Sequence, residues 1–299
     1  MAEIKFKKVE LGDRELITEF ASASGFRCDE YCFTSMFVWQ DYYGLEFGVT
    51  GDRLVTRLKG DRPRYSFPLG KGDLYTVIEA LREDARRLGF PLSMRGIPKC
   101  MLPVLKGLYP GLDFTYDRDE SDYMYLAEKL ATLSGKKLHA KRNHINRFVE
   151  QNDWQYEPVT RENLREVVAM TKAWLEQNYR EKHREYIGER MALARTFGNF
   201  TAVGLEGGLI RSGGRVIAYP LGEKLTEDTY VLHFEKAFPD IQGAYAMINR
   251  ENAKRILENH PEIVYINREE DMGLEGLRKA KESYFPEFLE EKYSALWEM

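Results

Sequence analysis

The sequence predicts an α/β protein of two similarly built halves, each with a mixed sheet and flanking helices. The second half reads helix, helix, three uninterrupted strands, helix, strand, helix and strand, and the first half can be read in nearly the same order. A segment without acidic residues, 129–149, lies between the halves. We therefore expect one domain at residues 1–133, a basic linker helix at 134–152 and a second domain at 153–299.

Apolar periodicity and turn signals place the elements of the first half. A Gly51-Asp52 turn joins two short strands into a hairpin, and a helix after Asp73 carries apolar residues at helical spacing. In chain order we expect helices at 13–24 and 31–42, strands at 45–50 and 53–59, a helix at 73–88, a strand at 91–94, a short helix at 98–108, and strands at 113–116 and 123–126.

The second half has clearer signals, because Gly213-Gly214 marks a hairpin between two long apolar runs. In chain order we expect a strand at 154–157, helices at 162–178 and 186–197, strands at 201–212, 215–225 and 229–235, a helix at 243–257, a strand at 263–266, a helix at 274–284 and a strand at 288–296. This order resembles the N-acetyltransferase-like (GNAT, acyl-CoA N-acyltransferase-like) fold. The fold class that we expect is therefore α/β with tandem GNAT-like domains.

Composition narrows the class of protein. Hydrophobic residues at 43% and charged residues at 31% are typical of a soluble globular chain. The sequence contains no run of about 18 apolar residues, so no membrane span is predicted. Its N-terminus lacks the apolar core of a signal peptide. We expect a cytoplasmic protein. The net charge of −4 argues against a surface that coats nucleic acid, although a local basic patch remains compatible with it.

The cysteines do not predict a metal site. Three cysteines suit a reducing compartment, and the Cys28/Cys32 pair has no second Cys or His pair at zinc-finger spacing. The acidic stretch 117–122 is interpreted as a solvated loop. Nothing in the sequence resembles a Ser-His-Asp triad or a phosphate-binding P-loop.

The acid-free segment predicts a basic helix, with Ser134 as its N-terminal cap. Its cations are Lys129, Lys136, Lys137, Lys141, Arg142 and Arg147. Such a helix attracts phosphate or another polyanion, and tRNA is the partner that we expect for it. The alternative is a solvated charged face. Lys141 and Arg142 favour the functional interpretation, because they lie on the apolar side of the helix, where a solvated face would not place them.

A second group of charges follows the strand at 263–266. Asp271 is a candidate N-cap for the next helix, in which Leu274, Leu277 and Tyr284 form an apolar stripe. Lys281 falls on that stripe and Arg278 on its edge. Two cations aimed inward are costly unless they are paired or hold an anion. The alternative to an anion site is an internal ion-pair network among Arg268, Glu269, Asp271, Arg278 and Lys281.

The turn before the helix at 243–257 indicates whether the chain binds coenzyme A as an acyl donor. In acetyltransferases this turn usually reads Q/R-x-x-G-x-G/A and binds the pyrophosphate of coenzyme A; here only Gln242-Gly243-Ala244 remains. Coenzyme A is therefore the less favoured donor. On the preceding strand, Glu235 is a candidate to position or deprotonate an amine, and a salt bridge is its alternative. For His233, the alternative to a role in the site is that of a core histidine.

Three blocks of sequence resemble a known family: residues 125–148, 233–249 and 265–286. They look like the recurring blocks of an uncharacterised bacterial family grouped with the C-terminal domain of phosphatidylglycerol lysyltransferases. The resemblance implies a tandem GNAT-like fold of the Fem type, whose members move an amino acid from aminoacyl-tRNA onto an amine or hydroxyl. We therefore expect an acyltransferase with aminoacyl-tRNA as donor and a small-molecule or peptide acceptor. A coenzyme A-dependent N-acyltransferase and a non-catalytic anion- or RNA-binding module are the alternatives.

The candidate site combines these groups. Glu235 is the expected catalytic carboxylate, and Lys281 and Arg278 are the expected oxyanion-binding cations. Asn249 and Asn267 could bind a substrate amide or carboxylate. The alternatives are that Asn249 is a helix-surface residue and that Asn267 is a turn former. The expected substrate-binding residues are Lys141, Arg142, His233, Gln242, Gly243, Asn249, Asn267, Arg268, Glu269, Asp271 and Tyr284. The aromatic residues Trp39, Tyr42 and Tyr43 are expected in the core of the first domain.

Overall fold

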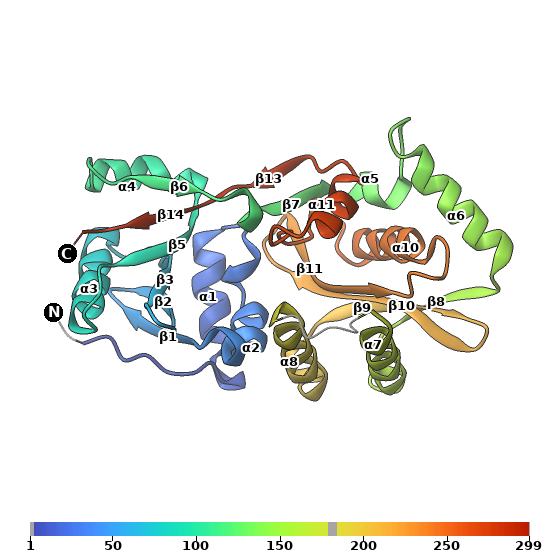
Figure 1. Cartoon of the computed structure of the whole chain (residues 1–299), viewed down its shortest axis with the longest axis horizontal. Helices are drawn as coiled ribbons and strands as arrows, with labels where there is room; N and C mark the ends of the chain where they lie inside the picture. The colour runs from blue at the N-terminus through green and yellow to red at the C-terminus, as the bar shows by residue number, and fades with distance from the viewer. Residues whose placement is uncertain (1–2, 179–183, 299) are drawn as a thin grey trace.

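The chain forms two seven-stranded sheets, each covered by helices, that lie one after the other along the long axis of the molecule (Figure 1). The computed structural model describes residues 3–178 and 184–298. Both termini lie at the same end of the molecule, beside the first sheet (Figure 1).

The first sheet has the strand order β1-β2-β3-β5-β14-β6, with β4 paired to β2. Its strands are β1 (Leu45–Thr50), β2 (Arg53–Leu58), β3 (Arg64–Ser66), β4 (Leu69–Gly70), β5 (Ser93–Pro98), β6 (Phe114–Tyr116) and β14 (Lys292–Leu296). The helices of this half are α1 (Arg14–Ser24), α2 (Phe33–Tyr43), α3 (Leu74–Arg87) and α4 (Leu102–Leu108). The predicted β1–β2 hairpin is confirmed, since Thr50 pairs with Arg53 across the Gly51-Asp52 turn. Asp73 caps α3 by accepting a hydrogen bond from the Thr76 backbone at 2.8 Å.

The second sheet has the strand order β13-β7-β12-β11-β10-β9-β8. Its strands are β7 (Asp122–Leu126), β8 (Trp154–Pro158), β9 (Glu206–Ser212), β10 (Arg215–Lys224), β11 (Thr229–Ala237), β12 (Tyr265–Asn267) and β13 (Phe288–Glu290). The remaining helices are α5 (Ala127–Thr132), α6 (His139–Gln151), α7 (Leu164–Asn178), α8 (Arg184–Gly198), α9 (Phe200–Val203), α10 (Ala244–Asn259) and α11 (Glu275–Glu282). The three uninterrupted strands of the prediction are β9, β10 and β11, although the first begins at Glu206 because residues 200–203 form α9.

Two strands cross the boundary predicted at residue 134. The predicted strand at 288–296 divides into β13, which pairs with β7 in the second sheet, and β14, which lies between β5 and β6 in the first. β7 precedes the basic helix in the chain and nevertheless belongs to the second sheet. The sequence shows where a strand lies but not which distant strand it pairs with, so neither crossing was predicted.

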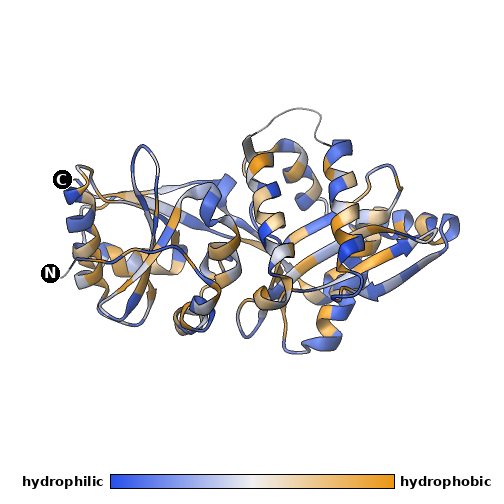
Figure 2. Ribbon diagram, turned by 90° about the horizontal axis from the view of Figure 1, so that it is seen from below, coloured by the Kyte–Doolittle hydropathy of each residue, from blue (hydrophilic) through white to orange (hydrophobic). Residues whose placement is uncertain are grey.

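Helices on both faces enclose the central strands of the second sheet. α10 lies on one face and α7 on the other (Figure 1), and Ile217 and Tyr219 of β10 are fully buried between them. Trp174 of α7 donates its indole N–H to the carbonyl oxygen of Ala237 at 2.8 Å. Figure 2 shows orange residues along these strands and both colours on the helices, as expected for helices with one buried and one exposed face. α8 contacts α2 of the first half through a hydrogen bond from Arg195 to the Phe37 carbonyl at 3.0 Å.

Two predicted helix caps are wrong. α6 begins after Leu138, and within the described residues no side chain caps it; instead Arg142 reaches back and donates to the carbonyl oxygens of Leu133 and Gly135. α11 begins after Leu274, because Met272 and Gly273 turn the chain with φ of 52° and 73°. Asp271 therefore accepts a hydrogen bond from the Gly273 backbone in that turn. Its contact with α11 is through the Arg278 side chain and not as an N-cap.

Candidate functional site

A cavity of about 840 Å³ lies where the two halves meet. Trp39 and Tyr43 of α2 and Arg95 of β5 line it from the first half, and β11, α11 and the loop after β12 line it from the second. Its wall combines aromatic rings with charged groups of both signs, as expected of a small-molecule site at a domain junction.

The structure brings together half of the predicted site residues. The residues that line the cavity are Lys141, His233, Glu235, Arg268, Glu269, Lys281 and Tyr284. Those that lie outside its described lining are Arg142, Gln242, Gly243, Asn249, Asn267, Asp271 and Arg278. From the fold class we expect Glu235, Arg268, Asn267, Arg278 and Lys281 to converge in one pocket, because a helix stripe and two strand ends meet there. Glu235, Arg268 and Lys281 do line the cavity, whereas Arg278 and Asn267 do not.

Glu235, near the end of β11, is held by two partners. Its carboxylate accepts a hydrogen bond from Arg268 at 2.8 Å and another from the side-chain amide of Asn249 at 3.1 Å. Asn249 is therefore a buried positioning residue on α10 and not a surface residue. Arg268 lies over the rings of Tyr125 and Tyr284, at 5.5 and 5.0 Å from their centroids. Burial opposes its charge, but Glu235 together with Tyr125 and Tyr284 outweighs that effect and raises the pKa of Arg268.

Lys281 supports the loop after β12. Its ammonium group donates to the carbonyl oxygens of Arg268, Glu269 and Glu270, which takes up its three N–H donors. In this loop Glu269 has a φ of 59°, a left-handed conformation that is costly for a residue with a Cβ atom. Burial lowers the pKa of Lys281, although nearby carboxylates oppose the change. These contacts favour a structural role for Lys281 over the oxyanion-binding role expected from the sequence.

Arg278 and Asp271 form an ion-pair network outside the cavity. Asp271 accepts hydrogen bonds from Arg278 at 2.8 and 2.9 Å and from Arg118 at 3.0 Å. Tyr123 also donates its hydroxyl hydrogen to Asp271. Burial alone would raise the pKa of Asp271, but these hydrogen bonds hold it well below its usual range. This part of the charged segment follows the ion-pair alternative.

Asn267 is buried beneath the loop. Its side-chain amide donates to the carbonyl oxygen of Arg27 at 2.7 Å and to Asp122 at 2.9 Å, and its own oxygen accepts from the Glu269 backbone. Asn267 thus joins the first half to the second sheet and shapes the turn that bears Glu269, which agrees with the turn-former alternative.

Lys141 brings a cation from the basic helix α6 into the cavity. Its ammonium nitrogen lies 3.9 Å from the centroid of the Tyr284 ring. In the part of the chain that the structure describes, Lys141 makes no hydrogen bond or ion pair. Burial and the charge of Arg268 lower the pKa of Lys141 to about 8. Lys141 is therefore a cation of the cavity wall that is available to an anionic ligand.

The start of α10 is closely covered by α6. Gly243 precedes the helix, and a Cβ atom added to it would lie 2.3 Å from the carbonyl oxygen of His144. Gln242 is exposed beside it. Gly243 therefore permits helix-to-helix packing here, on the turn where acetyltransferases would hold a pyrophosphate.

A β-bulge between β10 and β11 positions His233. Leu221 pairs with Phe234 and Gly222 with Leu232, which leaves His233 as the extra residue. Gly222 allows the close approach of the strands, because a Cβ there would lie 2.2 Å from the Val231 carbonyl oxygen. Bulges redirect side chains, and this one directs the imidazole toward the first half.

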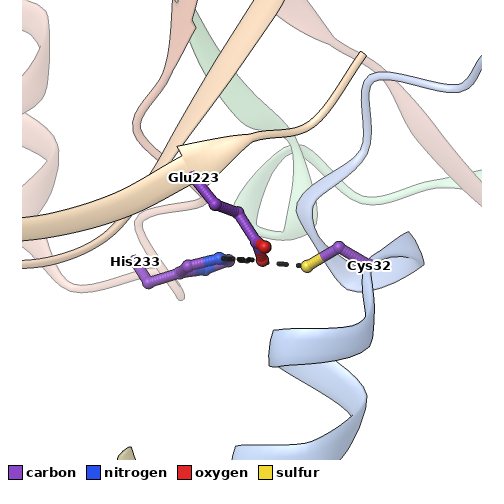
Figure 3. A group of neighbouring side chains, drawn as sticks. All are labelled: Cys32, Glu223 and His233. Atoms are coloured by element: carbon purple, nitrogen blue, oxygen red, sulfur yellow. Dashed lines mark hydrogen bonds and ion pairs between the residues drawn. The ribbon is translucent and has the colours of Figure 1, made fainter. Parts of the chain in front are cut away.

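Three groups surround the His233 ring, and two of them, Cys32 and Glu223, are drawn in Figure 3. Nδ1 lies 2.9 Å from a carboxylate oxygen of Glu269, Nε2 lies 3.1 Å from Glu223, and the sulfur of Cys32 lies 3.9 Å from Nε2. Burial opposes protonation, but Cys32, Glu223 and Glu269 together raise the pKa of His233 well above its usual range. Burial raises the pKa of the Cys32 thiol. His233 is therefore more than an apolar-core histidine, because it connects the two halves through polar contacts.

A second buried cluster surrounds Lys292 of β14. Its ammonium nitrogen lies 2.7 Å from Asp122, 3.0 Å from Asp29 and 3.2 Å from Glu30. Burial and the charge of Asp29 raise the pKa of neighbouring Glu270 to about 7. Carboxylates outnumber the ammonium in this cluster, so one of them is readily protonated.

Several groups at the cavity were not found in the sequence. Trp39, Tyr42 and Tyr43 line it and are not confined to the core of the first half; the available signal was that α2 has no distinct polar face. Cys32 and Glu223 had no usable signal, because their partners lie about 200 residues away or on a neighbouring strand.

The family model described as phosphatidylglycerol lysyltransferase, C-terminal, matches residues 24–296. The chain belongs to this family. The predicted resemblance is thereby confirmed over nearly the whole chain, beyond the three blocks from which it was inferred.

Solved structures share the fold of this chain. A conserved protein of unknown function from Bacteroides thetaiotaomicron is 41% identical, with a TM-score of 0.93 over 99% of this chain and 100% of that one. L-PGS from Bacillus licheniformis has a TM-score of 0.63 at 18% identity, over 95% of this chain and 92% of that one. FemX has a TM-score of 0.61 at 9% identity, over 97% of this chain and 96% of that one.

These likenesses confirm the predicted fold class, a mixed α/β structure of tandem GNAT-like and Fem-type architecture. An uncharacterised protein of Mycoplasmoides gallisepticum is 28% identical over 181 residues, which are 58% of this chain. The match spans about half (55%) of the length of that curated relative. Among the described helices, none has both the length and the apolar character needed to cross a bilayer.

Proposed function

We propose that this member of the lysyltransferase C-terminal family transfers an aminoacyl group from aminoacyl-tRNA to an amine or hydroxyl acceptor. The observation that carries the proposal is the position of Lys141. It lies on the basic helix α6, and its side chain reaches the cavity. Arg147 in the helix and Lys136 and Lys137 just before it are exposed cations. A polyanion bound along α6 would thus have its end close to Glu235 and Arg268.

The chemistry requires little beyond orientation, since an aminoacyl ester is already activated. An acceptor amine attacks the ester carbonyl, a C–N bond forms, and the C–O bond to the tRNA ribose breaks. Glu235 is the carboxylate placed to accept the proton that the amine loses and to return it to the ribose oxygen, which leaves as a hydroxyl. Lys141 is the cation with donors available for the oxyanion of the tetrahedral intermediate.

The same geometry disfavours coenzyme A as donor. GNAT enzymes use the free N–H groups at a helix start to bind pyrophosphate, and here α6 packs against that start at Gly243. The exposed Gln242 matches a residue type of the motif, but the glycine spacing of the motif is absent after it.

Charge reversal tests the donor. The triple variant Lys136→Glu, Lys137→Glu and Lys141→Glu should bind a pool of charged tRNA at least tenfold more weakly, and wild-type affinity should fall steeply with salt. Lys279→Glu is the matched control, because Lys279 is an exposed lysine of α11 whose ammonium pairs with Glu275. Transfer is followed as labelled amino acid that passes from tRNA to an added amine.

Two outcomes would overturn the proposal. Saturable coenzyme A binding by calorimetry, without tRNA binding, would identify the coenzyme A-dependent alternative. Binding of tRNA with no transfer or ester cleavage, for any amino acid in the pool, would identify an RNA-binding module.

A further inference from the structure

We propose that Cys32, Glu223 and His233 form a binding site for a divalent transition metal of the zinc type. Cys32 precedes the first turn of α2, Glu223 is the next-to-last residue of β10, and His233 lies on β11 (Figure 3). Their candidate ligand atoms, one sulfur, one carboxylate oxygen and one ring nitrogen, all lie within 4.8 Å of one another. Thiolate, imidazole and carboxylate are the three ligand types that zinc accepts in proteins.

The distances suit a shared ion. Nε2 of His233 lies 3.9 Å from the Cys32 sulfur and 3.1 Å from the Glu223 oxygen. With metal–ligand bonds of about 2.0–2.3 Å, tetrahedral ligands lie about 3.3–3.6 Å apart. Small side-chain rotations would therefore bring the three atoms to one ion, without a change in the backbone.

The hydrogen bonds around the imidazole call for a cation. Glu269 lies 2.9 Å from Nδ1, so the carboxylate accepts the Nδ1 proton and the Nε2 lone pair faces Glu223. Two acceptors then face each other at 3.1 Å, an arrangement that needs either a second proton or a metal ion between them. The Cys32 sulfur at the same point adds a soft donor atom, which a metal ion of the zinc type binds together with imidazole and carboxylate.

The cluster is built into the fold and is not an accidental surface grouping. The side chain of His233 is 2% exposed and that of Glu223 is 15% exposed. The bulge at His233 directs its ring to this point, and Glu269 orients the ring from the loop that Lys281 supports. In the other acidic cluster, by contrast, the ammonium of Lys292 already supplies the cation.

A metal here would tie the first half to the second sheet beside the cavity. Cys32 comes from the first half and the other two ligands from the second, and His233 also lines the cavity. The ion would thus set the relative positions of α2, with its cavity-lining aromatic rings, and β11, which carries Glu235.

Cobalt titration of the whole, reduced and chelator-treated protein tests the site. We expect uptake of one equivalent of Co²⁺ with a thiolate-to-cobalt charge-transfer absorption, and displacement of the cobalt by Zn²⁺. Cys32→Ser should abolish the charge-transfer absorption, and Cys100→Ser, which alters an exposed cysteine, should leave it unchanged. Glu269→Gln should weaken metal affinity about 10- to 100-fold, because it removes the partner of Nδ1.

Wild-type protein that takes up no cobalt or zinc at micromolar concentrations overturns the proposal whatever the variants do. An absorption that survives in folded Cys32→Ser overturns it as well. Should Cys32→Ser fail to fold, Glu223→Gln provides the second variant, and it too should lose affinity while the thiolate absorption of any residual complex persists. Unchanged affinity in folded Glu223→Gln would contradict the three-ligand site.

Discussion

The Glu235 carboxylate and the Arg268 guanidinium meet at 2.8 Å on the wall of the cavity, from positions 33 residues apart in the chain. Both side chains are largely buried, at 10% and 12% exposure. Burial makes the pair costly to break from either side, while the cavity gives substrates access to its carboxylate.

Arg268→Gln should cost about 3–5 kcal/mol of unfolding free energy, because it leaves Glu235 charged and without its cation. Denaturant unfolding measures the loss. Arg86→Gln is the control, since the Arg86–Glu83 pair is exposed and should contribute less than about 1 kcal/mol. Equal effects of the two changes would show that the Glu235–Arg268 pair behaves like a surface pair.

Lys281→Met should lower stability by several kcal/mol, since the carbonyl oxygens of Arg268, Glu269 and Glu270 would lose a buried donor. Thermal melts compare it with Lys279→Met, which changes an exposed lysine on the same helix. A wild-type melting midpoint combined with lost ligand binding would instead restore the anion-binding role that the sequence analysis assigned to Lys281.

Affinity for tRNA should fall as pH rises through about 8, because Lys141 has a lowered pKa of about 8 and loses its charge in this range. Lys141→Arg should remove the decline, since a guanidinium stays protonated. Binding isotherms from pH 6.5 to about 9.5 at constant salt give the measurement. A decline of the same size in Lys141→Arg would assign it to another group.

Glu270→Gln should change how stability depends on pH. The folded-state pKa of Glu270 is about 7, against about 4.3 in an unfolded chain, so the folded protein holds a proton that the unfolded chain has released between these values. Wild-type stability therefore contains a component that decreases as pH rises from about 4 to about 7. The titratable groups that interact electrostatically with Glu270 are Asp29, Tyr43, Arg95, Asp122, Glu269, Lys281 and Lys292.

At pH 8 the Glu270→Gln variant should be more stable than wild type by roughly 3–4 kcal/mol, and at pH 4.5 the difference should be small. Glu275→Gln, at an exposed position, is the control. A difference independent of pH would contradict the raised pKa.

Local patterns were enough to predict most elements, because hairpin turns and helical periodicity depend on neighbouring residues. Gly213-Gly214 is an example: its hairpin joins β9 to β10 where expected. Cavity residues were found when they lay near a strand end or on a helix stripe, as Glu235 and Lys281 do. Local patterns did not predict that Asn267 lies outside the cavity or that the last strand divides into β13 and β14. Both features depend on contacts with residues more than 100 positions away in the chain.

Strand β14 has a consequence for biosynthesis. It lies between β5 and β6, so the first sheet stays open at both of those strands until the ribosome has made residues 292–296. Lys292 arrives with the same strand, and until then Asp29 and Asp122 face each other without their cation. The half that is synthesised first should therefore be completed last. A ribosome that stops early would release a chain with unpaired strand edges, the kind of surface that chaperones and proteases recognise.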